Sequence, residues 1–225
     1  MKIGIIAAMQ VEVKKLLDNM EIQNVENHYG RDVHIAEFNG LKLFIGVCGI
    51  GKANAASFTQ LLIDKYDPEL IINTGIAGSL QAGLGTLSLV IADELYQHDI
   101  PTRILASTYP GDGISVFETD EKLRGILVKS VPSEVNLRVG PVASGDNFIN
   151  SQQLKEEIVE KTSALACDME SAAIAQIAFG ADKKCLIIRS ISDEADDSAD
   201  ETYDNFEEAA ANLSVEVLLK FLGNL

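Results

Sequence analysis

The hydrophobic positions of this chain fall into short uninterrupted runs separated by longer segments of mixed polarity. The runs are four to eight residues long, and several show no alternation of polar and apolar residues. Uninterrupted apolar runs of this length are typical of strands that are buried on both faces. We therefore predict strands at Lys2–Ala8, Val33–Phe38, Leu41–Cys48, Leu70–Thr74, Leu87–Ala92, Arg138–Ser144, Ala164–Cys167 and Cys185–Ser190.

The segments between these runs predict helices. The C-terminal helix is expected to begin at a capping box, because Asp204 and Glu207 have the required spacing. Its apolar residues fall on one stripe, made of Phe206, Ala210, Leu213, Val217 and Phe221. The full set of predicted helices is Val11–Met20, Lys52–Lys65, Asp120–Lys129, Ser151–Lys161, Ser171–Phe179 and Asn205–Leu222.

Strands that alternate with helices predict an α/β fold. We expect a central mixed, mostly parallel sheet flanked by helices, with one antiparallel hairpin at Asn39-Gly40. The sequence has no internal repeat, low-complexity tract or linker, so one domain is expected to span residues 1–225. The segment Tyr96–Phe117 is rich in turn formers, especially at Tyr109–Gly113, and predicts a lid or binding loop.

Composition and charge exclude several classes of partner. Hydrophobic residues make up 47% of the 225 residues, which is enough for a sizeable core. The formal net charge is −16, and so acidic a surface repels nucleic acid and anionic membranes. No apolar stretch approaches the roughly 18 residues that span a bilayer. Glu12 and Lys14 interrupt the apolar N-terminus too early for a signal peptide.

The cysteines and histidines form no recognisable metal or disulfide pattern. Cys48, Cys167 and Cys185 are odd in number and lack Cys-x-x-Cys spacing, which predicts reduced, buried thiols in a cytoplasmic protein. The three histidines are scattered without the spacing of metal ligands. We therefore expect neither a metal nor another cofactor.

The stretch Gly49-Ile50-Gly51-Lys52 lies between a predicted strand and a predicted helix, where phosphate could bind. Counted from Gly46, the sequence fits the first part of a P-loop, but Ala53 has no hydroxyl to hold magnesium. A tight turn that lets the helix approach the sheet is the favoured interpretation.

Two further loops follow predicted strands. The glycines of Asn73–Ser79 allow a flat ligand to lie against the backbone. In Ser144–Asn150, Phe148 is available to stack on a ring, although a hydrophobic anchor under a turn explains it equally well.

The acidic segment Asp193–Glu201 raises the question of calcium. Ligand spacing of an EF-hand loop can be followed from Asp196 to Glu207, but Glu201 stands where the loop needs glycine. A solvated acidic loop is favoured, with Asp193 as the exception because it directly follows an apolar strand.

Two carboxylates near the C-terminus, Glu170 and Asp193, lie where an apolar stretch meets a polar one. In α/β proteins such positions border the ligand site, so the pair suggests proton-transfer chemistry. Glu12, in the first turn of the first helix, holds a comparable position. Taken alone, the position of Glu12 is explained by its favourable interaction with the helix dipole.

Taken together and in order, the motifs of this chain resemble those of the 5'-methylthioadenosine/S-adenosylhomocysteine nucleosidases, a family with the nucleoside phosphorylase fold. The resemblance runs along nearly the whole chain. The motifs that carry it are Ala8-Met9-x-x-Glu12, Gly49-Ile50-Gly51-Lys52, Asn73-Thr74-Gly75-x-Ala77-Gly78, Ser144-Gly145-Asp146-x-Phe148-Ile149-Asn150, Asp168-Met169-Glu170 and Arg189-Ser190-Ile191-Ser192-Asp193.

The resemblance implies hydrolysis of the N-ribosidic bond of 5'-methylthioadenosine and S-adenosylhomocysteine, and by extension of 5'-deoxyadenosine, to adenine and the 5-substituted ribose. It implies that Asp193 protonates adenine N7, with Ser192 orienting it. Glu12 would activate the water, assisted by Arg189. Bond cleavage needs such an acid and such a base because positive charge builds on the ribose and negative charge on the departing adenine.

The same resemblance implies the substrate contacts. Glu170 would accept hydrogen bonds from the ribose hydroxyls, with Met169 beneath the ring. Phe148 would stack on adenine, and the backbone of Ile149 would recognise its edge. The remaining residues assigned to substrate binding are Met9, Ile50, Ala77 and Gly78. A homodimer is also implied.

Several positions depart from the family pattern and leave the 5'-group of the substrate open. Ile76 stands where family members often have Ser or Thr, and Asp168 stands where Glu is more usual. The segments Thr86-Leu87-Ser88 and His98–Arg103 also differ from the family pattern. The alternatives are a sibling enzyme acting on an aminodeoxyfutalosine-type or ordinary purine nucleoside, and a purine-binding sensor without turnover. Intact Glu12 and Asp193 argue against the sensor, and Glu12 would repel phosphate, which favours hydrolysis over phosphorolysis.

Overall fold

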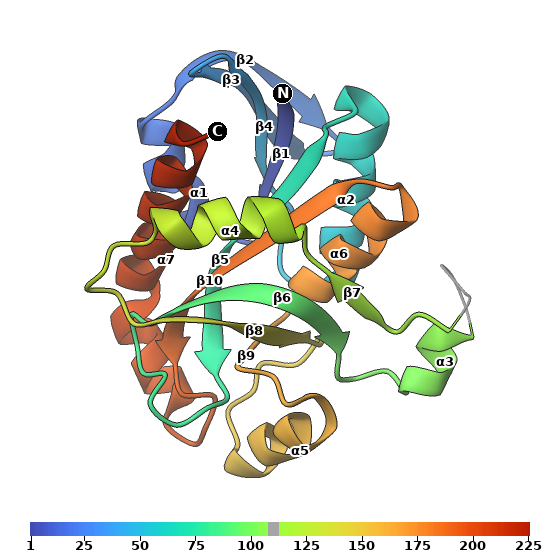
Figure 1. Cartoon of the computed structure of the whole chain (residues 1–225), viewed down its shortest axis with the longest axis vertical. Helices are drawn as coiled ribbons and strands as arrows, with labels where there is room; N and C mark the ends of the chain where they lie inside the picture. Colours follow the sequence, from blue (N-terminus) through green and yellow to red (C-terminus); the bar gives the residue numbers. More distant parts are fainter. Residues whose placement is uncertain (108–112) are drawn as a thin grey trace.

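Strands and helices alternate along most of the chain in the computed structural model, which describes residues 1–107 and 113–225 (Figure 1). The strands are β1 (Lys2–Ala7), β2 (Glu21–His28), β3 (Arg31–Phe38), β4 (Leu41–Val47), β5 (Leu70–Ser79), β6 (Leu89–Gln97), β7 (Val116–Glu118), β8 (Leu137–Ser144), β9 (Ala166–Asp168) and β10 (Lys184–Asp193). The helices are α1 (Val11–Asp18), α2 (Lys52–Tyr66), α3 (Thr102–Ala106), α4 (Glu121–Ser130), α5 (Gln152–Thr162), α6 (Ser171–Gly180) and α7 (Ala199–Gly223).

The described strands form one mixed sheet with a parallel centre, in which β4, β1, β5 and β10 lie side by side. Their apolar runs are buried on both faces, as the uninterrupted pattern predicts. Because β10 pairs with β6 as well as with β5, the strands β5, β10, β6, β8 and β9 close into a ring. The predicted α/β fold with a mixed sheet is confirmed.

The antiparallel part of the sheet is larger than the single predicted hairpin. The β3–β4 hairpin is confirmed, and its turn residues Asn39 and Gly40 have φ angles of 49° and 78°, as a type I′ turn requires. A second hairpin joins β2 to β3 across Tyr29-Gly30. Antiparallel pairing also joins β10 to β6, β6 to β7 and β5 to β9.

Helices cover both faces of the sheet and create two hydrophobic cores (Figure 1). On one face apolar residues of α1, α4 and α7 share a cluster with Ile3 and Ile5 of β1. On the other face α2 and α6 pack against Ile6 and its neighbours. Alternate residues of one strand thus enter different cores, which explains why both kinds of position are apolar.

Three strands and one helix extend beyond the predicted limits. β5, β6 and β10 continue to Ser79, Gln97 and Asp193, into segments that contain glycine or polar residues. The last helix begins at Ala199 rather than Asn205, so the predicted capping box is wrong. Strand pairing and helix packing outweigh the local composition at these ends.

The predicted lid segment Tyr96–Phe117 is not one continuous loop. Within it, β6 ends at Gln97, α3 occupies Thr102–Ala106 and β7 begins at Val116. In Figure 1, α3 lies at the outer edge of the fold. Most of the turn-rich run at Tyr109–Gly113 lies outside the described residues, which resume at 113.

None of the described helices is long and apolar enough to cross a membrane.

Candidate active site

One cavity, with a volume of about 350 Å³, collects most of the residues singled out in the sequence. This volume is in the range of small-molecule sites. Every predicted site residue except Arg189 lines it. The complete lining is Ala8, Met9, Glu12, Ile50, Ile76, Ala77, Gly78, Asn147, Phe148, Ile149, Cys167, Asp168, Met169, Glu170, Ser192, Asp193, Asp200, Tyr203 and Asp204.

Glu12 is held by backbone amides from two elements. Its Oε2 accepts hydrogen bonds from the amides of Ala8 (2.8 Å) and Met9 (2.9 Å), and its Oε1 accepts one from Ile76 of β5 (3.0 Å). Burial raises the pKa of Glu12, while Arg189 and the three amides act in the opposite direction. The carboxylate is therefore fixed in orientation while retaining a capacity to take up a proton.

The room for Glu12 depends on Gly75 in β5. A Cβ atom at this position would lie 2.2 Å from Oε1 of Glu12 and 3.3 Å from Nη1 of Arg189. Side-chain atoms cannot approach so closely, so any other residue at position 75 would displace the carboxylate. Glycine is thus required by the site and not by the strand.

Glu170 follows β9 at the start of α6. Its Oε1 accepts a hydrogen bond of 2.8 Å from the amide of Gly51. Burial, followed by the charge of Asp168, raises the pKa of Glu170 to about 7. Near neutral pH this group is therefore divided between its two protonation states.

Asp193 enters the cavity through a β-bulge. The pairing of β10 with β5 shifts register between Ile191 and Asp193, so that Asp193 stands opposite Gly78. Its Oδ2 accepts a hydrogen bond from the hydroxyl of Ser192 (2.8 Å), and its Oδ1 accepts one from the amide of Ala195 (2.9 Å). Burial is the main cause that raises the pKa of Asp193, as expected of an acid that must carry a proton.

The sequence suggested that acidic neighbours would raise the pKa of Asp193. Asp196 does contribute in this direction, but burial is the larger cause.

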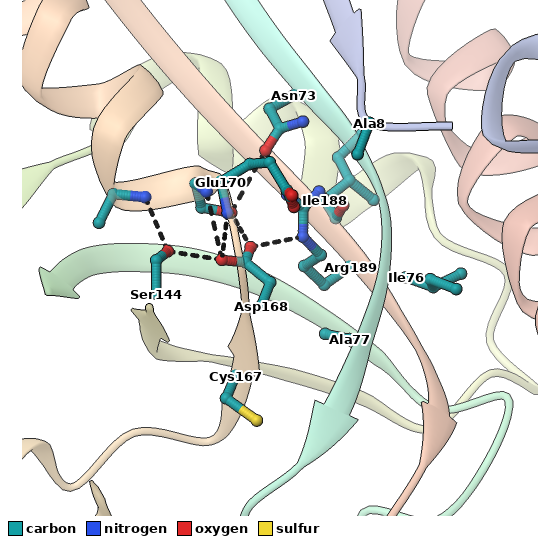
Figure 2. Close-up of polar contacts among 12 residues, drawn as sticks. Ala8, Asn73, Ile76, Ala77, Ser144, Cys167, Asp168, Glu170, Ile188 and Arg189 are labelled. Carbon is teal, nitrogen blue, oxygen red and sulfur yellow. Dashed lines mark hydrogen bonds and ion pairs between the residues drawn. The ribbon is translucent and has the colours of Figure 1, made fainter. Parts of the chain in front are cut away.

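Arg189 lies beneath the cavity and not in its wall. Its side chain is 2% exposed and forms an ion pair of 2.7 Å between Nε and Oδ2 of Asp168 (Figure 2). Nη1 donates to the carbonyl of Ile188 (3.0 Å), and Nη2 donates to Oδ1 of Asn73. The guanidinium is thus committed to protein groups, and its charge reaches Glu12 and Glu170 through space.

Two aromatic residues, Phe148 and Tyr203, also line the cavity. Phe148 is 41% exposed, and its ring meets that of Tyr203 edge to face at 5.7 Å. The Tyr203 hydroxyl donates to Glu207 (2.8 Å) and lies 3.4 Å from Sδ of Met9. An exposed aromatic face at the cavity can stack on a flat ligand.

Sequence reasoning missed the contribution of α7 to the cavity, which consists of Asp200, Tyr203 and Asp204. Asp200 falls in the segment Asp193–Glu201 interpreted as a solvated loop, and Tyr203 and Asp204 lie just before the predicted helix Asn205–Leu222. Had the helix been predicted to begin at Ala199, their i, i+3, i+4 spacing would have placed them on one face.

The loop at Gly49–Lys52 binds carboxylates of the protein itself. Gly49 and Gly51 have φ angles of 89° and 99°, which confirms the tight turn. The amide of Gly51 donates to Glu170, and that of Lys52 donates to Oδ1 of Asp146 (2.8 Å). The helix N-terminus that could have bound phosphate thus orients groups of the site.

No group of three or more His, Cys, Asp or Glu side chains in residues 1–107 and 113–225 could hold a metal ion. The calcium interpretation fails locally because Asp200, Asp204 and Glu207 belong to α7 rather than to a loop. Asp196 instead accepts hydrogen bonds from the amide and hydroxyl of Ser198.

Comparisons with known proteins agree with this geometry. The model of the phosphorylase superfamily matches residues 2–223. The chain is 36% identical to the 5'-methylthioadenosine/S-adenosylhomocysteine nucleosidase of Maridesulfovibrio salexigens, with all of both sequences covered.

Two solved structures show the same fold. The S-adenosylhomocysteine nucleosidase of Streptococcus pyogenes, in complex with 5-methylthiotubericidin, is 32% identical with a TM-score of 0.94, covering 100% of this chain and 97% of that one. A futalosine hydrolase of Helicobacter pylori is 28% identical with a TM-score of 0.92, covering 100% and 98%.

Proposed function

The chain belongs to the 5'-methylthioadenosine/S-adenosylhomocysteine nucleosidases, within the phosphorylase superfamily, and we propose on this basis that it hydrolyses the N-ribosidic bond of these two nucleosides. The products are adenine and the 5-substituted ribose. The observation that carries the proposal is a single cavity with three buried carboxylates, Glu12, Glu170 and Asp193, each held by at least one backbone amide.

Asp193 is assigned the role of acid for the leaving group. Cleavage of the bond between the sugar and the base leaves negative charge on adenine, which protonation at N7 neutralises. The raised pKa of Asp193, caused mainly by burial, supports a proton on this carboxyl group. Ser192 orients it through the hydrogen bond to Oδ2.

Glu170 is assigned to the sugar. Its ionised form would accept hydrogen bonds from the ribose hydroxyls and stabilise the positive charge that develops on the ring. Met169 lines the cavity directly before it and would lie beneath the ring.

Glu12 is assigned to the water. It would take one proton as the water oxygen bonds to the anomeric carbon, while the electron pair of the broken bond leaves with adenine. The three amides that point at its carboxylate support an ionised group in a fixed orientation. Arg189 assists by its charge, from behind the cavity wall.

Adenine is assigned to the pocket between Phe148 and Asp193. Stacking on Phe148 and recognition by the backbone of Ile149 would hold the base. Met9, Ile50, Ala77 and Gly78 complete the substrate contacts.

Hydrolysis is favoured over phosphorolysis by the charges of the cavity. No lysine or arginine is among the described residues that line it. The amides of Gly51 and Lys52 are already bonded to Glu170 and Asp146, and Glu12 would repel a phosphate ion. A phosphate nucleophile requires the opposite arrangement.

We also propose that the chain acts as a homodimer of one-domain subunits in the cytoplasm. The large apolar residues Ile50 and Phe148 are 52% and 41% exposed beside the cavity, which suits a surface covered by a second subunit. The cysteines Cys48, Cys167 and Cys185 are free, as is usual in a reducing compartment. Light scattering on the purified protein tests the dimer.

Adenine release tests the substrate assignment. We expect release from 5'-methylthioadenosine and S-adenosylhomocysteine at equal rates with and without phosphate, and slower release from adenosine. A strict need for phosphate contradicts the hydrolase. Preference for a futalosine-type nucleoside favours the sibling enzyme, and binding without turnover favours the sensor.

A further inference from the structure

Asp168 is a buried carboxylate whose two oxygens are fully engaged by the protein. Its side chain is 2% exposed. Oδ1 accepts hydrogen bonds from the Ser144 hydroxyl (2.5 Å) and from the amides of Glu170 and Ser171 (3.2 Å each). Oδ2 accepts from Arg189 Nε (2.7 Å) and from the Ser171 hydroxyl. No lone pair is left over for a ligand, so Asp168 must act through its neighbours.

These neighbours belong to three elements, namely β8, β10 and the start of α6. Figure 2 shows Asp168, at the end of β9, between Ser144 of β8 on one side and Arg189 of β10 on the other. The hydroxyl of Ser144 also accepts a hydrogen bond from the amide of Ala172 in α6. One carboxylate therefore ties the end of β8 and the middle of β10 to the start of α6, the helix that Glu170 precedes.

The contact with Arg189 is electrostatically necessary. A fully buried guanidinium without a counter-charge strongly destabilises the folded protein. Burial alone would raise the pKa of Asp168, but Arg189 and the hydroxyls of Ser144 and Ser171 outweigh it and hold the pKa below its usual value. The pair is thus an ion pair at neutral pH, and it fixes where the positive charge lies relative to Glu12 and Glu170.

We infer that Asp168 is a positioning residue for the hydrolysis, because it holds the Arg189 guanidinium beneath the cavity and fixes the backbone of Glu170 through its amide. The inference rests on the function proposed for the same cavity. It extends that function to a residue that makes no bond to the substrate.

Asp168 also controls the charge state of Glu170. The charged groups that face Glu170 are Asp168, Arg189 from β10 and Glu12 from α1, and the Gly51 amide faces it from the start of α2. Asp168 and Glu12 favour the protonated form, whereas Arg189 and the amide favour the ionised form. Removing the charge of Asp168 leaves Arg189 less compensated, so both effects lower the pKa of Glu170.

The variants Asp168→Asn and Asp168→Ser test this inference. Serine is smaller than asparagine, so Asp168→Ser avoids a steric clash if Asp168→Asn does not fold. For adenine release from 5'-methylthioadenosine we expect kcat to fall about 10- to 100-fold, with a smaller change in KM. In a plot of kcat against pH, the acid limb should move to lower pH by ~1 unit or more. Carboxyl NMR of Glu170, assigned with Glu170→Gln, should show the same shift.

Ser144→Ala is the matched control. It removes a donor to the same oxygen of Asp168 and the acceptor for Ala172, but it leaves both charges of the ion pair. We expect a less stable protein whose Glu170 titrates as in the wild type. If both neutral variants of Asp168 also leave that titration and the acid limb unchanged, Asp168 is a structural residue only and the inference is wrong.

The two proposals fail in different ways. A wild-type protein that releases no adenine refutes the proposed function, and the NMR titration still decides whether Asp168 sets the charge of Glu170. If the wild type is active and the Asp168 variants leave the titration of Glu170 and the acid limb unchanged, only the positioning role is refuted.

Discussion

The three carboxyl groups of the cavity are all buried, and they differ mainly in the hydrogen-bond donors that surround them. Glu12, Glu170 and Asp193 are all buried at one cavity, yet Glu12 is bonded by three amides, Glu170 by one, and Asp193 by one amide and one hydroxyl. Donors stabilise the ionised form, while burial stabilises the protonated form. In all three groups burial prevails and the pKa is raised, so the donors fix the orientation of each carboxyl group while it remains able to carry a proton.

Replacing Asp193 by Asn removes the proton that the leaving adenine requires. We expect kcat for 5'-methylthioadenosine to fall by a factor of about 10²–10⁴, the range of general acid catalysis. Binding of a non-hydrolysable adenine nucleoside analogue, measured by calorimetry, should change by less than about tenfold. Asp197→Asn, an exposed neighbour in the same acidic segment, is the control and should keep wild-type turnover. Wild-type turnover in Asp193→Asn would refute the acid assignment.

The pKa of Glu170 predicts a pH-dependent stability. Burial raises this pKa from 4.5 to about 7, so the folded protein binds a proton more tightly than the unfolded chain. The stabilising effect of protonation is complete below pH 4.5 and is lost as the pH rises through 7. At pH 8 we therefore expect Glu170→Gln to be more stable than the wild type by about 3 kcal/mol, with little difference at pH 4.

Thermal unfolding at both pH values measures this effect. The control is Glu160→Gln, which neutralises an exposed carboxylate on α5 and should show no such pH dependence. Equal stability of the wild type and Glu170→Gln at pH 8 would show that Glu170 is not destabilised by its burial.

At the scale of elements, strand ends and helix starts build the site. The amino ends of α1, α2, α6 and α7 all contribute, through Glu12, the amides of Gly51 and Lys52, Glu170 and Tyr203. Helix N-termini favour negative charge, which suits a cavity rich in carboxylates. The elements thus stabilise charges that the core alone would exclude.

Gly75 offers a test at this scale. We expect Gly75→Ala to displace the Glu12 carboxylate and to lower kcat about 100-fold, because an added Cβ would lie 2.2 Å from Oε1 of Glu12. Gly125→Ala is the matched control on the exposed side of α4, where an added Cβ meets nothing within 4 Å. It should keep activity and add roughly 0.5–1 kcal/mol of stability. Full activity in Gly75→Ala would show that Glu12 does not need its observed position.

Elements that are long and deeply buried could be predicted from the sequence, whereas short or exposed elements could not. Strands such as β1 and β4 are apolar except for one lysine each and could be located to within one residue. β2 is mostly polar and exposed, and α3 has five residues, so neither leaves a clear periodic pattern. β7 forms only because β6 offers it a partner, which no local signal reveals.

At the scale of the whole molecule, the ring of β5, β10, β6, β8 and β9 brings distant segments together. Phe148 and Asp193 are far apart in sequence and reach the cavity from the loop after β8 and from β10, two strands of this ring, and Glu12 reaches it because β1, which precedes α1, pairs with β5. The motifs themselves could be recognised from the sequence, since each follows a predicted strand.

The sequence did not reveal how the charges of the site are paired. It suggested a role for Arg189 beside Glu12, but it gave no sign that the ion-pair partner of the guanidinium is Asp168. The wall contributed by α7 was also missed, because the position of that helix depends on packing against β5, β10 and α1. Such contacts are properties of the assembled fold and leave no local pattern.

Hydrolysis rather than phosphorolysis is the central claim, and the fate of the sugar tests it most directly. The protein is incubated with 5'-methylthioadenosine in heavy-oxygen water (H₂¹⁸O) containing phosphate, and the sugar products are analysed by mass spectrometry. We expect free 5-methylthioribose that carries the heavy oxygen at the anomeric carbon. Formation of 5-methylthioribose 1-phosphate without the label would contradict the account.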